Sequence, residues 1–145
     1  MVWAQRAFVA LVAGALLAGG GMAVYVQRAF PALDGRLAVP GLRHGVSVQR
    51  DSADVTHIQA QSAQDAWFAM GYVHAQERTW QLEFNRRVLH GELSEVFGPA
   101  TLETDKLMRA LDIMGHARRQ YAGLPAHARE ALQVYSQGIH AFHKN

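Results

Sequence analysis

The segment from residue 7 to residue 26 contains no charged side chain, and it constrains this sequence more than any other feature. At about 1.5 Å rise per residue, a helix of this length reaches about 30 Å, the hydrocarbon thickness of a bilayer. A buried core helix is a poor alternative, because the remaining residues could not easily cover a helix that is apolar on all sides. We therefore expect residues 1–30 to be a membrane-directed segment, with residues 7–26 in contact with the membrane.

Two interpretations of this segment stay open. A secretory signal has a basic start, a short apolar stretch and small residues at its cleavage site, which Arg6 and Gly21-Met22-Ala23 supply. A retained anchor needs the whole span, which is also present. Positive residues on both flanks, Arg6 and Arg28, leave the orientation open. Either interpretation predicts an exported protein, in the periplasm or another extracytoplasmic site, free or anchored to the inner membrane.

Charge and cysteine content exclude several classes of function. The chain has 14 basic and 12 acidic residues, and without Arg6 and Arg28 the two kinds are equal in number. No basic run or basic–aromatic pattern remains to bind nucleic acid. The sequence has no cysteine, which excludes disulfides, zinc–thiolate sites and cysteine nucleophiles.

Short extended runs follow the apolar segment. Residues 31–45 are expected to form a linker and a first short strand at 36–39. Alternating residues at 45–50 and 55–60, separated by the polar turn 51–54, predict a β-hairpin. Because a hairpin alone is marginally stable in water, it needs a further sheet or a helix to lie on.

The helical part begins at Ser62, which forms a capping-box pattern with Asp65 three residues later. The pattern continues to residue 89, allows a break at 76–78, and has Gly91 as its expected C-cap.

Shorter helices are predicted beyond Gly91. One covers residues 92–97 and is stopped by Gly98-Pro99. Thr101 is expected to cap the next helix, which kinks at Gly115 and ends at Gly123.

The last predicted helix carries an apolar stripe of Leu132, Tyr135 and Ile139. The stripe continues to the terminus without a stop signal, which indicates an incomplete domain. The predicted fold class is α+β: mostly helical, with an N-terminal β-hairpin and an N-terminal apolar helix.

The residues offer little chemistry of their own. His140 and His143 share a helix face, but no nearby carboxylate completes a metal shell, so solvated histidines are the expected reading. His57 and His74 are expected to be hydrogen-bonded structural residues. The five serines, Ser47, Ser52, Ser62, Ser94 and Ser136, lie outside any Gly-x-Ser-x-Gly motif. We therefore assign no catalytic residue and no metal ligand.

Two groups of side chains allow two interpretations each. The aromatic residues are expected to form core, although they could also line a substrate pocket; they are Trp67, Phe68, Tyr72, Trp80 and Phe84. Arg86-Arg87 forms either a salt-bridged helix face or, with carboxylates such as Asp51, Glu83 and Glu95, a buried network that ties helix to strand.

Several motifs occur in a fixed order between residues 46 and 142. The positions that carry them are Arg50, Asp51, His57, Gly71, Tyr72, Ala75, Gln76, Arg78, Gln81, Arg86, Arg87, Gly91, Leu93, Ser94, Glu95 and Gly98. With Asp105, Arg109 and residues 135–142, this order resembles the first part of the small subunit in the penicillin acylase family of N-terminal nucleophile hydrolases. The sequence departs from the family pattern at Asp54 and Thr56, which replace the usual Gly and Pro, and at Glu77 and His140, which replace Asp and Asn.

The resemblance implies a precursor that cuts itself into a small and a large subunit. The new N-terminal residue of the large subunit is the nucleophile and its α-amine is the base. The family fold is an αββα sandwich, to whose sheet the hairpin would belong. Calcium, where the complete enzyme binds it, would use residues outside this chain. Residues 46–145 then form an incomplete acylase-like domain whose partner is the large subunit or the rest of the precursor.

The first functional hypothesis is therefore that this chain is part of an amidohydrolase. The complete enzyme would cleave the amide bond of an N-acyl substrate, with a nucleophile that lies outside this chain. Penicillins, acyl-homoserine lactones and other N-acyl amines all fit. The alternative is an inactive truncated remnant or a small membrane-anchored helical interaction protein. On either hypothesis this chain alone is expected to be inactive.

Overall fold

The computed structural model describes residues 2–29 and 34–144, and the chain divides into two compact units, residues 1–37 and residues 38–145. The predicted boundaries after residues 30 and 45 stay predictions, and residues 30–33 of the expected linker lie outside the described part.

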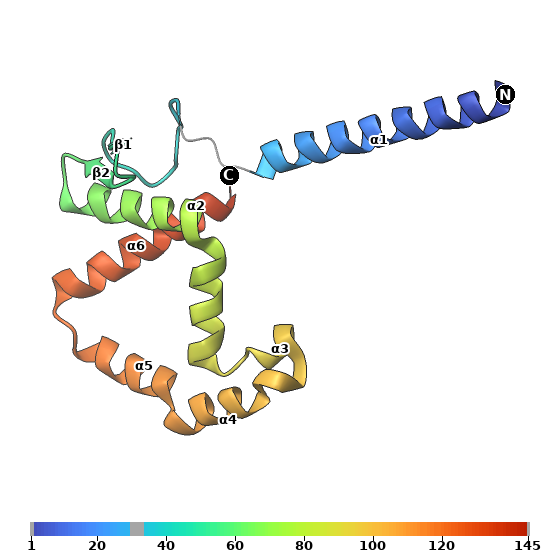
Figure 1. Ribbon diagram of the computed structural model, residues 1–145. Helices are drawn as coiled ribbons and strands as arrows, with labels where there is room; N and C mark the ends of the chain where they lie inside the picture. The colour runs from blue at the N-terminus through green and yellow to red at the C-terminus, as the bar shows by residue number, and fades with distance from the viewer. Residues whose placement is uncertain (1, 30–33, 145) are drawn as a thin grey trace. The chain divides into compact units, whose positions relative to one another are not determined.

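The first unit is built on α1 (Val2–Ala29), a continuous helix (Figure 1). Its window Leu11–Arg28 is long and apolar enough to cross a membrane, and none of it is buried within the protein. Glycines at 19, 20 and 21 do not interrupt the helix, although each costs about 1 kcal/mol relative to alanine in a helix interior. A signal sequence would show the same features, so both interpretations of this helix stay open.

The expected first strand at residues 36–39 does not form. Residues 35–39 have no regular secondary structure, and Pro40 and Gly41 make a turn directly after them. A strand needs a neighbour to accept its hydrogen bonds, and none of the described strands lies beside this segment.

The predicted hairpin is confirmed. Strand β1 (Ser47–Arg50) pairs antiparallel with β2 (Thr56–Gln59), with Val48 opposite Ile58. The Asp51 carboxylate accepts the N–H groups of Ala53 at 2.9 Å and Val55 at 3.0 Å, which closes the turn. Asp54 has a φ of 60° and so adopts the left-handed conformation that the missing glycine would favour.

Helix α2 (Ala63–His90) begins directly after the predicted cap Ser62 and ends one residue beyond the predicted residue 89. Ser62 Oγ accepts the Asp65 N–H at 3.0 Å, and Gly91, with a φ of 64°, forms the C-cap. The break allowed at residues 76–78 is also confirmed, because Arg78 has non-helical angles of φ −136° and ψ 27°. The Thr79 hydroxyl donates to the Ala75 carbonyl at this point, a side-chain bond that often bends helices.

The core of the second unit lies where α2 packs against α6 (Ala126–Lys144) (Figure 1). Phe68, Ala69, Val73 and Ala75 are the buried apolar residues that α2 contributes. Two glycines allow the backbones to approach: a Cβ on Gly71 would lie 2.0 Å from the Tyr135 carbonyl oxygen. A Cβ on Gly138 would lie 2.0 Å from the Phe68 carbonyl oxygen.

The predicted apolar stripe on α6 is correct only in part. Tyr135 and Ile139 flank the contact at Gly138, whereas Leu132 is 49% exposed. The physical reason is that the two helices meet around one close backbone contact, and Leu132 lies more than a turn away from it.

The chain continues through α3 (Ser94–Phe97), a 3-10 turn at Gly98–Thr101, α4 (Leu102–Leu111) and α5 (Ile113–Gly123). The predicted kink at Gly115 is wrong by three residues, because the break falls at Asp112. Asp112 has a φ of 48°, and its carboxylate accepts the Gly115 N–H at 3.1 Å. Thr101 does not cap α4; its hydroxyl donates to the Gly98 carbonyl instead.

The expectation that the aromatic residues form core holds for Phe68 and in part for the half-buried Tyr72 and Phe84, of which Phe84 packs edge-on against Phe97 at 6.2 Å. Phe68 is 3% exposed, and the Tyr72 ring packs edge-on against Phe142 at 5.5 Å. Trp67 and Trp80 are 42% and 57% exposed. The fold class is confirmed: mostly helical, with one antiparallel hairpin and an apolar N-terminal helix.

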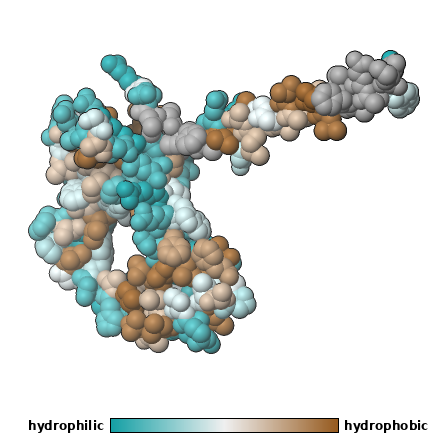
Figure 2. All heavy atoms as spheres, viewed as in Figure 1, coloured by the Kyte–Doolittle hydropathy of each residue, from teal (hydrophilic) through white to brown (hydrophobic). Residues whose placement is uncertain are grey.

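Apolar side chains also gather on the surface over α3 and α4, where Figure 2 shows brown atoms. The exposed residues there are Val96, Phe97, Leu102, Leu107 and Leu111. These side chains form an exposed apolar surface on the second unit.

Candidate functional site

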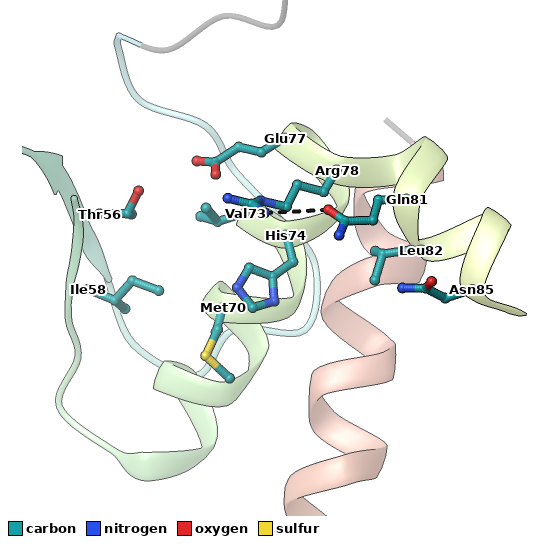
Figure 3. A pocket seen from close by; sticks show the side chains of 10 residues that line it. All are labelled: Thr56, Ile58, Met70, Val73, His74, Glu77, Arg78, Gln81, Leu82 and Asn85. Atoms are coloured by element: carbon teal, nitrogen blue, oxygen red, sulfur yellow. Dashed lines mark hydrogen bonds between the residues drawn. The ribbon is translucent and has the colours of Figure 1, made fainter. Parts of the chain in front are cut away.

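A groove of about 400 Å³ lies between β2 and the kinked helix α2 (Figure 3). Both halves of α2 line it, because the kink at Arg78 bends the helix around the space. The lining residues are Thr56, Ile58, Met70, Val73, His74, Glu77, Arg78, Gln81, Leu82 and Asn85.

The groove has an apolar floor and polar walls. Figure 3 shows Thr56 and Ile58 extending from β2 toward α2, with Met70 and His74 on the first half of the helix facing them. Leu82 and Asn85 extend from the second half. The alternation of β2 explains this arrangement, because Thr56 and Ile58 share the half-covered face of the strand while His57 and Gln59 are exposed.

The two charged side chains of the groove have different surroundings. Glu77 accepts a hydrogen bond from Arg50, which ties β1 to α2. The Arg78 guanidinium donates a long hydrogen bond to Gln81 Oε1 at 3.4 Å. Among the residues that the structure describes, Arg78 has no carboxylate within ion-pair distance. The described groove therefore carries an unneutralised positive charge.

The two histidines singled out from the sequence both make hydrogen bonds. His74 Nδ1 lies 2.9 Å from the Tyr135 hydroxyl, which links α2 to α6 beside the groove. Burial raises the pKa of Tyr135, so its hydroxyl stays protonated over the ordinary pH range. His57 Nε2 lies 2.9 Å from Asp51 Oδ2 in the exposed hairpin. Hydrogen bonds from His57 and from the Val55 N–H hold the pKa of Asp51 below its ordinary value of 3.8.

Arg86 and Arg87 form a salt-bridge network, but not with the strands. Glu83 accepts from Arg86 Nε at 2.7 Å and from Arg87 Nε at 2.6 Å. The two arginines then reach Glu92 at 3.1 Å and Glu95 at 2.9 Å. The network ties α2 to α3, and Asp51, which the sequence suggested as a partner, lies in the hairpin turn instead. The two arginines hold the pKa of Glu83 at about 2, and the hydrogen bond from Arg86 has the largest effect. Glu83 in turn raises the pKa of Arg86.

A buried carboxylate holds the next turn. Asp105 is 3% exposed and accepts the N–H groups of Leu93 at 2.8 Å and Ser94 at 2.7 Å. Arg109 Nε donates to the Gly91 carbonyl at 2.9 Å. Burial alone would raise the pKa of Asp105. The hydrogen bonds from Ser94 and Leu93 and the charge of Arg109 outweigh this effect, so the pKa lies below its ordinary value.

Asp65 is the polar anchor whose tertiary role the sequence did not reveal. It is 2% exposed, accepts the Arg43 N–H at 2.8 Å, and lies 3.0 Å from His44 Nδ1. Hydrogen bonds lower the pKa of Asp65 to about 2. The bond from the Arg43 N–H has the largest effect, followed by those from the Ser62 hydroxyl and His44. The capping-box position was the only sequence signal, and it gave no hint of the partners 21 and 22 residues earlier.

The sixteen motif positions therefore gather into three regions. Arg50, Asp51 and His57 belong to the hairpin. Gly71, Tyr72, Ala75, Gln76, Arg78 and Gln81 belong to the first half and the kink of α2. The junction of α2 with α3 contains Arg86, Arg87, Gly91, Leu93, Ser94, Glu95 and Gly98. Their functional assignment stays a prediction.

No three His, Asp or Glu side chains in residues 2–29 and 34–144 come together in a way that could hold a metal ion. Calcium binding by the complete enzyme stays a prediction.

Comparisons with known proteins agree on one family. The family model described as penicillin amidase matches residues 45–145. The chain therefore belongs to the penicillin amidase family, a family of acyl-amide hydrolases.

Individual relatives have more specific names. Penicillin acylase 2 proenzyme from Pseudomonas sp. (strain SE83) is 41% identical over 117 residues, which are 81% of this chain and 15% of that protein. Acyl-homoserine lactone acylase QuiP from Pseudomonas fluorescens (strain Pf-5) is 34% identical over 133 residues, 92% of this chain and 16% of that protein. The chain thus spans about a sixth of the length of these curated relatives.

A solved structure shows the same fold. Thermostable penicillin G acylase from Alcaligenes faecalis is 31% identical, with a TM-score of 0.61. The similarity covers 69% of this chain and 53% of that chain.

Proposed function

We propose that this chain is the opening part of the small subunit of an exported acylase that hydrolyses the amide bond of an N-acyl substrate. The observation that carries the proposal is the family match over residues 45–145, in a chain that spans only 15% of its relative from strain SE83. The nucleophile and its α-amine base then lie outside these residues, on the large subunit.

In this proposal the residues of the chain act as scaffold. The α2–α6 pair forms a rigid base, and the Arg50–Glu77 pair fixes the hairpin on it. Asp105 and the Glu83 network set the direction of α3 and α4. The exposed apolar side chains over α3 and α4 then become buried against the rest of the acylase, which would supply the cover that this unit lacks.

The substrate class is proposed from the relatives. Their names refer to penicillin and to acyl-homoserine lactone, and both compounds carry an acyl group on an amine nitrogen. We assign the same bond type to the complete enzyme, and leave the acyl group to the residues that line its pocket elsewhere in the precursor.

The α1 helix supports export of the complete protein. A fractionation of cells that produce the full chain tests whether it also anchors the protein. A retained anchor predicts a chain of full length that stays in the membrane pellet after alkaline carbonate extraction. A cleaved signal predicts a shorter, soluble periplasmic product. Full-length chain in the cytosol would contradict both.

A chimeric precursor tests the enzyme proposal. Residues 1–145 replace the matched N-terminal region of the penicillin acylase 2 proenzyme, and the unmodified proenzyme is the positive control. We expect self-cleavage and hydrolysis of an N-acyl substrate. The matched negative control is the same chimera with Gly138→Ala, which should mature poorly because the new Cβ forces α2 and α6 apart. A chimera that is produced but never matures would favour the alternative, an inactive remnant.

A further inference from the structure

The groove between β2 and α2 carries a charge that the described residues do not neutralise. Of its two charged side chains, Glu77 is neutralised by Arg50, whereas Arg78 makes a hydrogen bond to the neutral Gln81 and has no ion-pair partner among residues 2–29 and 34–144. The arginines next along α2 differ in this respect, because Arg86 and Arg87 each bind two carboxylates. Arg78 is therefore available to a carboxylate from outside the described residues.

The position of Arg78 directs this charge into the groove. Its backbone lies at the kink of α2, and its side chain extends over the groove beside Val73 and Gln81 (Figure 3). Gln81 and Asn85 add amide groups on the same side. A guanidinium with amide neighbours is a suitable receptor for a carboxylate, because it offers several N–H donors in one plane.

The floor of the groove requires an occupant with apolar groups as well. Ile58, Met70, Val73 and Leu82 line it. The hairpin on one side has two strands in the described residues, and such a hairpin is marginally stable until something packs on it. The occupant thus needs an apolar part to cover the hairpin and a carboxylate to meet Arg78.

We propose that the groove binds an extended, carboxylate-bearing segment of the rest of the acylase polypeptide, with Arg78 as the residue that pairs with its Asp or Glu. This inference rests on the proposed function. The relatives supply the reason to choose a polypeptide, because 85% of the length of the strain SE83 proenzyme lies outside the region that this chain matches. Arg78 is a recognition residue for assembly and takes no part in the chemical step.

The chimeric precursor described above tests the proposal through three variants. Arg78→Lys keeps the charge, Arg78→Ala removes it, and Arg78→Glu reverses it. Arg118→Ala is the matched control, since Arg118 is an exposed arginine on α5 with no ion-pair partner among the described residues. The measurement is the fraction of precursor that becomes assembled, mature enzyme, together with kcat of the purified product.

We expect assembly to fall about tenfold or more in Arg78→Ala, because an interfacial carboxylate is left without its partner. Arg78→Glu should fall further, Arg78→Lys should keep most of the assembly, and Arg118→Ala should match the unmodified chimera. The kcat of whatever enzyme matures should not change.

Other outcomes overturn the inference. Equal assembly of Arg78→Glu and the unmodified chimera would remove Arg78 from the interface. A lower urea midpoint of the full chain with Arg78→Ala, large enough to account for the lost assembly, would make its role structural. Saturable binding of phenylacetate to the full chain, lost in Arg78→Ala while assembly is unchanged, would assign the groove to a small acid. If the unmodified chimera itself never matures, the proposed function fails, and this inference fails with it.

Discussion

Replacing Gly138 by alanine tests the contact on which the second unit is built. The new Cβ would lie 2.0 Å from the Phe68 carbonyl oxygen and 2.9 Å from the Tyr72 nitrogen. Non-bonded carbon atoms prefer separations of about 3.5 Å, so α2 and α6 would have to move apart by more than about 1 Å. The obstructing atoms are backbone, which cannot turn aside as a flexible side chain would.

The expected cost follows from two opposing terms. Overpacking costs about 1–3 kcal/mol, and a clash with backbone belongs at the upper end of that range. Alanine in place of a helical glycine returns about 1 kcal/mol. The free energy of unfolding should therefore fall by about 2 kcal/mol. Urea unfolding of the full chain in detergent micelles, followed by far-UV circular dichroism, measures this difference.

Gly123→Ala is the matched control, because a Cβ at that position of α5 meets nothing within 4 Å. It should leave the stability unchanged or raise it by less than about 1 kcal/mol. A double variant, Gly71→Ala with Gly138→Ala, should cost little more than either alone, since one separation of the helices relieves both clashes. Wild-type stability of Gly138→Ala, or full additivity in the double variant, would refute the close approach of α2 and α6.

Three further predictions concern single side chains. Asp54→Gly should raise the urea midpoint, because glycine accepts a φ of 60° more readily than aspartate does. Asp54→Ala should lower the midpoint, since an alanine in that conformation costs about 1 kcal/mol. Equal midpoints would contradict the turn geometry. Gly91→Ala should lower the free energy of unfolding by about 2 kcal/mol. Alanine is strained at this positive φ, and its Cβ would lie 2.6 Å from the Asp105 carbonyl oxygen. An unchanged urea midpoint would argue against this C-cap. The pKa of Asp65 is about 2 in the folded chain against an ordinary 3.8, so its stabilising effect is present above pH 3.8 and is lost as the pH falls toward 2. An acid titration of the urea midpoint should therefore be less steep in Asp65→Asn than in the unmodified chain, and identical slopes would show that Asp65 is not the titrating group.

Local features were predictable from sequence where a residue determines its own surroundings. The Ser62 cap and the turn around Asp51 depend on side chains that bind backbone only a few residues away. The Gly91 cap depends on the left-handed conformation that glycine adopts readily. The sequence allowed a break in α2 at residues 76–78 but did not require one. The break near Asp112 was misplaced because glycine is the usual sign of a helix break, whereas here an aspartate adopts the left-handed conformation and caps the next helix.

The candidate site was less predictable. Arg50, Glu77 and Arg78 stood out as family positions or as a departure from the family pattern. Only the folded chain shows that Arg50 neutralises Glu77, and that Arg78 has no carboxylate within ion-pair distance in the part of the chain that the structure describes. Ion pairs between residues 27 apart depend on how the hairpin lies on the helix, and no local pattern encodes that. The same holds for Asp65, whose partners come from the segment before the hairpin.

The sequence by itself determined the apolar N-terminal helix, the hairpin with the long helix that follows it, and the membership of residues 45–145 in the penicillin amidase family. The helix and the hairpin depend on composition and short-range periodicity, which a linear chain displays directly. The family membership depends on the order of specific motifs along the chain. Only the tertiary structure decided that α2 and α6 meet at Gly71 and Gly138, that Trp80 stays exposed, and that a charged groove opens beside the hairpin. These features depend on backbone separations and on which faces find a partner, because packing sums contacts between segments that lie far apart in sequence.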